Sequence, residues 1–118
     1  MTIQRLIGGL FVLCLPIGCA QDPETTAACQ SAVDAAYNYP AYYSDDQIGE
    51  VQDQALRDCE TVEDFSEGVK RNLGGETSDE LAHDVLAAFC TGPLDRSLAD
   101  APVCQHLREV DPDAFDRI

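Results

Sequence analysis

The amino-acid sequence predicts an all-α fold, a small up-and-down bundle of about four helices stapled by two disulfides. Apolar residues recur at spacings of three and four along successive stretches of the chain, which is the period of an amphipathic helix. No stretch alternates strictly between apolar and polar residues over five or six positions, so no strand is predicted. Four cysteines lie at or near the expected helix ends or inside the helices, where they can join neighbouring elements.

The first helix is predicted from Pro23 to about Tyr37. Asp22 is a suitable capping residue, and proline is favoured in the first turn because its ring already has a helical φ. Pro40 blocks continuation of the helix, so residues 38–44 are predicted to form a loop. Small side chains along the helix would let a second helix approach closely, and these are Ala28, Ala32, Val33 and Ala36.

The next two helices have clear start signals. Ser44 with Gln47 forms a capping box, and Thr61 with Asp64 has the same three-residue spacing. Gly74 stands where a left-handed C-cap would end the second of these helices. The predicted apolar faces are Ile48, Val51, Ala55 and Cys59 in the first helix, and Val62, Phe65, Val69 and Leu73 in the second.

A fourth helix is predicted to begin at a capping box of Thr77 with Glu80 and to end at Cys90. Its apolar stripe is Leu81, Val85, Leu86 and Phe89. The connection to the preceding helix is short, so the two helices are expected to run antiparallel. After Cys90 only short helical segments are predicted, and residues 111–118 have too few apolar side chains to predict an ordered element.

The chain begins with the features of an export signal. Arg5 precedes an apolar run over residues 6–17, which is too short for a membrane-spanning helix of ~20 residues. The run ends in Ile-Gly-Cys at residues 17–19, which resembles the lipobox of bacterial lipoprotein precursors, although Pro16 stands where that motif usually has leucine. The resemblance covers only the signal. It implies that Cys19 is lipid-modified, becomes the new N-terminus and anchors the protein to the outer face of the cell membrane.

Ordinary signal cleavage after Ala20 is the alternative, because Gly18 and Ala20 are both small, and the protein would then be secreted. Removing 18 residues from 118 leaves 100, which suits one domain. The predicted organisation is a signal peptide over residues 1–18, a tether over 19–24, a disulfide-bonded helical domain over 25–110 and an acidic tail over 111–118.

Four cysteines remain once Cys14 leaves with the signal and Cys19 is lipidated or cleaved away: Cys29, Cys59, Cys90 and Cys104. An even number in an exported chain favours two disulfides. A zinc site using these thiols with His83 or His106 is disfavoured, because the chain has no C-x-x-C pair, and no metal or cofactor is predicted. Four cysteines allow three connectivities, of which Cys29–Cys59 with Cys90–Cys104 is preferred because it staples neighbouring elements of an up-and-down bundle.

The charge balance is strongly acidic, with seven Lys and Arg against 22 Asp and Glu and a formal net charge of −15. No run of positive residues is longer than Lys70 with Arg71, which argues against a nucleic-acid site or a basic lipid-headgroup site. The acidic residues are scattered, which is typical of a solvated surface. A site for cations or for a basic protein is the alternative interpretation.

The four tyrosines of the chain fall within seven residues around Pro40, at Tyr37, Tyr39, Tyr42 and Tyr43. Aromatic side chains with a polar tip are effective in recognition, because they provide a large contact area at little entropic cost. They are therefore the predicted partner-binding residues, for an envelope protein or a small ligand. The alternative is that they cover the end of the bundle and serve only its core.

No catalytic motif is present. His83 and His106 lack the sequence context of a serine or cysteine triad and are interpreted as surface histidines. The acidic residues of the C-terminus, Asp111, Asp113 and Asp116, lack the glycine and terminal glutamate of an EF-hand calcium loop. No catalytic residues are assigned, and the protein is interpreted as a non-enzyme.

The function predicted from the sequence is a binding or structural role in the cell envelope. The spacing of Cys59, Phe65, Phe89, Cys90 and Cys104 is similar to that of small exported helical bacterial proteins of uncharacterised function, a resemblance that transfers no active residue. Two alternatives remain open: a small secreted hydrolase whose residues converge only in three dimensions, and an acidic module that binds cations or basic proteins.

Overall fold

The computed structural model describes residues 23–118, which contain only helices and the loops between them. The all-α prediction is therefore confirmed over this range. The signal peptide, Cys19 and most of the predicted tether lie outside the described residues. The helices in order are α2 (Pro23–Tyr37), α3 (Asp45–Asp58), α4 (Val62–Leu73), α5 (Asp79–Thr91), the 3-10 helix η1 (Arg96–Asp100), α6 (Pro102–Val110) and α7 (Ala114–Arg117).

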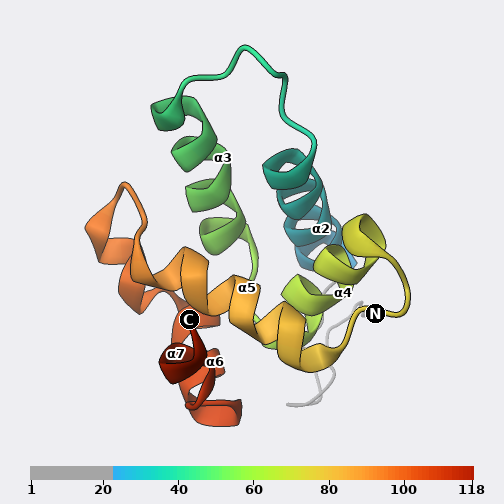
Figure 1. The fold of residues 1–118 in the computed structure, drawn as a ribbon, viewed down its shortest axis with the longest axis vertical. Helices are drawn as coiled ribbons and strands as arrows, with labels where there is room; N and C mark the ends of the chain where they lie inside the picture. Colours follow the sequence, from blue (N-terminus) through green and yellow to red (C-terminus); the bar gives the residue numbers. More distant parts are fainter. Residues whose placement is uncertain (1–22) are drawn as a thin grey trace, which may run out of the picture.

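Helices α2 and α3 lie side by side and are joined by the loop at the top of Figure 1. Helix α4 packs against α2, and α5 packs against α4 and the lower end of α3 (Figure 1). The other side of α5 carries α6 and α7, so α5 contacts both halves of the chain. The bundle therefore consists of four main helices with two short C-terminal ones packed on α5.

The predicted helix starts agree closely with the structure. The capping box of Ser44 with Gln47 forms in both directions, and the Thr61 hydroxyl accepts a hydrogen bond from the Asp64 amide. The cap of α5 is Ser78, one residue after the predicted Thr77, and its hydroxyl accepts from the Leu81 amide at 3.1 Å. The shift arises because the Thr77 amide is already used in the preceding turn, where it donates to the Gly74 carbonyl.

Gly74 ends α4 with φ of 121° and ψ of 148°. The positive φ confirms the need for glycine at this position, since side chains disfavour it. The ψ value differs from the left-handed helical cap that the sequence predicted. The chain therefore leaves α4 in an extended direction and turns back towards α5.

The core is built from the predicted apolar faces. Phe65 is fully buried and meets Phe89 edge to face, with ring centroids 5.4 Å apart. Edge-to-face contact suits the charge distribution of aromatic rings and adds to their burial. The other fully buried large side chains include Leu56, Leu86 and Leu107, which come from α3, α5 and α6. One continuous core therefore joins the N-terminal and C-terminal helices.

Helices α2 and α4 approach closely at Gly68. A Cβ atom at this position would lie 2.9 Å from the side chain of Val33. Such a distance is shorter than carbon atoms tolerate, so an alanine here would force the two helices apart. The small residues predicted on α2 therefore meet a glycine on α4 that the sequence pattern had not identified.

The preferred disulfide connectivity is confirmed. Cys29 is bonded to Cys59 with their Cα atoms 4.5 Å apart, and Cys90 is bonded to Cys104 with theirs 5.8 Å apart. The first bond links α2 to the end of α3, and the second links α5 to α6. All four cysteines are buried in the core, so both bonds are shielded from solvent.

The C-terminal residues belong to the domain, whereas the sequence predicted a separate acidic tail over 111–118. Ala114 is fully buried and Phe115 packs against the core. The guanidinium of Arg108 lies over the Phe115 ring at 5.1 Å from its centroid, and Arg117 pairs with Asp84 of α5. A few contacts with distant residues therefore order a segment that has little hydrophobic pattern of its own.

Candidate functional site

The tyrosine loop, residues 38–44 with Tyr39, Tyr42 and Tyr43, forms an aromatic cluster on the surface. The rings of Tyr39 and Tyr43 are stacked with their centroids 6.0 Å apart, and the Tyr42 ring meets Tyr43 edge to face at 5.6 Å. Tyr42 is 81% exposed. The loop carries no charged residue, so it presents an uncharged aromatic surface on an otherwise acidic chain.

Tyr37 has a different role from the other three tyrosines. It is the last residue of α2, is half-buried and packs against the core. Burial raises the pKa of its phenol above the ordinary value. The alternative interpretation, that the tyrosines cover the core, therefore holds for Tyr37. The rings of Tyr39, Tyr42 and Tyr43 contact each other instead.

The base of the tyrosine loop is tied to the end of α4 by a polar network. The Asn38 side chain donates to Asn72 Oδ1 at 2.8 Å, and the Asn72 amide donates to Asp34 at 2.8 Å. Asp34 also accepts a hydrogen bond from Arg71 at 2.8 Å. These two donors, Arg71 first, hold the pKa of the Asp34 carboxyl below its ordinary value. The loop therefore starts from a fixed anchor point.

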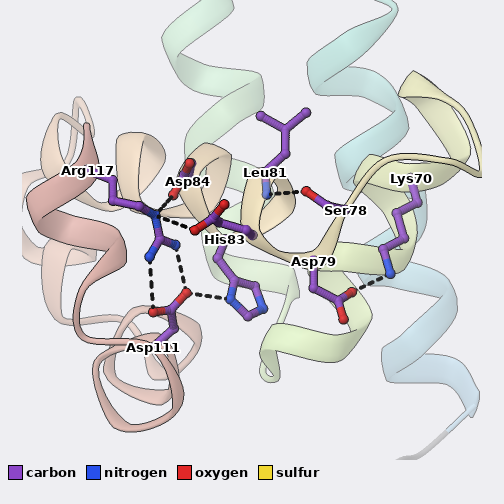
Figure 2. Close-up of polar contacts among 9 residues, drawn as sticks. Lys70, Ser78, Asp79, Leu81, His83, Asp84, Asp111 and Arg117 are labelled. Carbon is purple, nitrogen blue, oxygen red and sulfur yellow. Dashed lines mark hydrogen bonds and ion pairs between the residues drawn. The ribbon is translucent and has the colours of Figure 1, made fainter.

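A second polar network surrounds His83 on α5. Its Nδ1 lies 2.8 Å from Asp111, which also receives a 2.8 Å hydrogen bond from Arg117 (Figure 2). Arg117 in turn donates to Asp84 at 2.7 Å. Hydrogen bonds from Arg117 and then His83 lower the pKa of Asp111, and the carboxylates raise that of Arg117. This network fastens α7 and the end of α6 to α5.

His106 has a structural role. Its Nδ1 accepts a hydrogen bond from the backbone amide of Val62 at 2.9 Å, at the first residue of α4. Amides in the first turn of a helix have no partner within the helix, so the imidazole satisfies one of them. Both histidines are half-buried and hydrogen-bonded, which differs from the predicted surface position.

Asp53 is a buried carboxylate that sequence reasoning did not single out. It accepts hydrogen bonds from the backbone amides of Leu94 and Asp95, at 3.1 and 2.9 Å. These contacts hold the segment after α5 against α3. The partners are more than 40 residues apart in the chain, so no local signal could have identified the contact.

Among residues 23–118, no group of three or more His, Cys, Asp or Glu side chains is arranged to hold a metal ion. No helix in the same range is long and apolar enough to cross a membrane. Of the partner-binding residues that the sequence predicted, the structure brings Tyr39, Tyr42 and Tyr43 together in the tyrosine loop, whereas Tyr37 packs against the core.

Comparison with protein families, with curated proteins and with solved structures found no match. Functional arguments therefore rest on the geometry of this chain.

The Asp111 network is expected to make the stability of the fold depend on pH in the acidic range. A carboxyl whose pKa is lowered in the folded chain contributes stability above its unfolded pKa of ~3.9, and this stability is lost as the pH falls through the folded value. The variant Asp111→Asn lacks this contribution. We expect it to be less stable than wild type at neutral pH, with the two unfolding curves converging below about pH 4.

Chemical unfolding followed by circular dichroism at pH 7, 5, 4 and 3 measures this difference. The matched control is Asp113→Asn, which removes a nearby exposed carboxylate that forms no ion pair with the described residues. A constant difference between Asp111→Asn and wild type over the whole pH range would contradict the expected response.

Proposed function

We propose that this protein is an exported binding protein of the cell envelope that uses the tyrosine loop to recognise a partner protein. It is held at the outer face of the cell membrane by lipid on Cys19. The observation that carries the proposal is the cluster of Tyr39, Tyr42 and Tyr43, which expose stacked aromatic rings outside the core. Exposed tyrosines cost free energy in water and are enriched where partner proteins bind.

Three further features support this proposal. The disulfides Cys29–Cys59 and Cys90–Cys104 are compatible with an exported protein, because such bonds persist outside the reducing cytosol. The loop is anchored at its base through Asn38 and Asn72, so its rings lose less conformational freedom when a partner binds. An uncharged loop on a chain of net charge −15 can also contact a partner without direct charge repulsion.

Changing Tyr39, Tyr42 and Tyr43 together to alanine is expected to weaken partner binding by roughly 30-fold or more, because truncating a central aromatic contact has effects of this size. The fold should remain, since none of the three rings belongs to the core. The measurement is photo-crosslinking in cells from a photoreactive residue at position 42, followed by binding assays with the captured protein and the purified variants.

The matched control places the photoreactive residue at Leu94, which is also exposed and lies on the segment after α5. A specific partner should crosslink from position 42 and not from position 94, and Tyr39→Ala with Tyr43→Ala should remove the crosslink. Equal capture from both positions, or unchanged affinity of the triple variant, would contradict the role of the loop.

The lipid anchor has a separate test. Mass spectrometry of the mature protein is expected to find Cys19 as the N-terminal residue with a lipid mass attached, and Cys19→Ser should move the protein from the membrane to the soluble fraction. A mature chain that begins at Gln21 without a lipid would instead indicate ordinary cleavage after Ala20 and a secreted protein.

A further inference from the structure

A groove of about 240 Å³ lies between α4 and α5. None of its lining residues belongs to the tyrosine loop. Val62 of α4 and Val110 of α6 are its apolar lining residues. The remaining lining side chains are polar, and three of them are carboxylates, Glu63, Glu67 and Asp79. A groove of this size and composition suits a small group that combines a charge with a short apolar body.

The charge of the groove favours a cation. Asp79 already forms an ion pair with Lys70, which is drawn in Figure 2. Glu63 and Glu67 form no direct hydrogen bond or ion pair with any described residue, but Glu67 lies close enough to Lys70 to help raise the pKa of that ammonium group. The groove therefore holds three carboxylates against one positive side chain. Glu63 and Glu67 are four residues apart on α4, so they lie on the same side of the helix, where like charges repel. A positive group placed at this edge would remove that repulsion, whereas an anion would add to it.

The buried hydroxyl of Ser66 also indicates a ligand in this groove. Ser66 lines the groove, is only 5% exposed, and its hydroxyl is the one buried side-chain polar atom without a hydrogen-bond partner in the described part of the chain. Buried hydroxyls are usually hydrogen-bonded, because leaving water without a new partner is unfavourable. The hydroxyl oxygen is covered by neighbouring atoms, so a group that enters the groove would reach it only after a lining side chain shifts.

His83 provides a further acceptor. Its Nδ1 is engaged by Asp111, and Figure 2 shows the second ring nitrogen on the side away from that carboxylate. When Nδ1 carries the proton that it donates to Asp111, the neutral ring has its lone pair on Nε2. The Asp111 contact also fixes the orientation of the ring. An imidazole acceptor is thereby held in the wall of the groove.

We propose that this groove binds a primary ammonium group on a short alkyl chain. Glu63 and Glu67 supply the opposite charge, and the Ser66 hydroxyl and His83 Nε2 accept N–H hydrogen bonds. The alkyl chain lies against Val62 and Val110. Lys70 shows the same chemistry within the protein, since its ammonium group is held by Asp79 at this groove. The site is independent of the tyrosine loop, and the failure of either proposal leaves the other in place.

The test is an NMR titration of the purified, disulfide-bonded protein with n-butylammonium chloride, n-butanol and sodium butyrate. The ammonium salt is expected to cause saturable shifts at the Ser66 and His83 amides, while the neutral and anionic compounds cause none. Equal shifts with n-butanol would overturn the proposal. Titration with the N-acetyl methylamide of lysine distinguishes the source: tighter binding than n-butylammonium indicates a lysine side chain of a protein, and weaker binding indicates a free amine.

Two variants test which side chains bind the ammonium group. Glu63→Gln with Glu67→Gln is expected to weaken n-butylammonium binding by roughly five- to tenfold, as two exposed ion pairs are lost. The matched control is Asp46→Asn with Glu50→Gln, a pair of acidic residues also four apart but on α3, which should leave the affinity unchanged. Ser66→Ala should weaken binding while the melting temperature stays the same or rises. Equal effects of the two charge variants would indicate general attraction to an acidic protein and overturn the site.

Discussion

Replacing Cys29 and Cys59 together by alanine is expected to lower the free energy of unfolding by about 3.5 kcal/mol. The bond closes a separation of 30 residues, and a longer loop loses more conformational entropy in the unfolded chain when it is closed. The bond between Cys90 and Cys104 closes a separation of only 14 residues, so its removal is expected to cost about 3 kcal/mol. Either loss is a large part of the ~5–15 kcal/mol that stabilises a typical domain.

Urea unfolding of the two double variants, followed by circular dichroism, measures both values. The order of the two effects is the decisive result, since both pairs are equally buried and both variants remove two sulfur atoms from the core. If the Cys29–Cys59 variant does not fold at 25 °C, the comparison can be made at lower temperature. A larger loss for the Cys90–Cys104 variant would contradict the loop-closure argument.

Phe65→Ala is expected to lower the free energy of unfolding by about 3 to 5 kcal/mol. Phe65 is fully buried and makes an edge-to-face contact with Phe89, so its truncation removes both hydrophobic burial and an aromatic pair, and leaves a cavity. The cavity would lie in the core shared by the N-terminal and C-terminal helices, where no single element can move to fill it.

The control for this prediction is Phe89→Ala. Phe89 belongs to the same aromatic pair but is only partly buried, so its loss should be clearly smaller. Phe65→Leu, with an expected loss of about 1 kcal/mol, keeps the measurement available if the alanine variant fails to fold. Equal losses for Phe65→Ala and Phe89→Ala would contradict the expectation that the fully buried ring contributes more to stability.

The candidate site was predictable from the sequence only in part. Four tyrosines within seven residues identified the loop, because their proximity in the chain guarantees proximity in space. Which ring would serve the core was not predictable: Tyr37 packs inward since it ends α2, whereas Tyr42 follows Pro40 and is exposed. The anchor between Asn38 and Asn72 spans 34 residues and left no pattern in either local sequence.

The groove between α4 and α5 was even less predictable from the sequence than the tyrosine loop. Glu63, Glu67 and Ser66 are ordinary helix-surface residues in the sequence, and His83 alone was considered for a functional role. Only the packing of α5 against α4 makes one site of them, by bringing His83 to the side of α4 that carries Ser66. The orientation of the imidazole depends on Asp111, which lies 28 residues further along the chain.

The sequence by itself predicted the four main helices and the N-terminal caps of α3 and α4, because these follow from residues close in the chain. It also favoured the observed disulfide pairing among three possibilities, because the paired cysteines lie on neighbouring elements. Tertiary structure decided the features that depend on distant partners. Gly68 is required only because α2 approaches α4 at Val33, and residues 111–118 are ordered only because Ala114 is buried and Arg117 reaches Asp84. Periodicity and capping describe what one segment prefers, whereas close packing and buried charge depend on which segments meet.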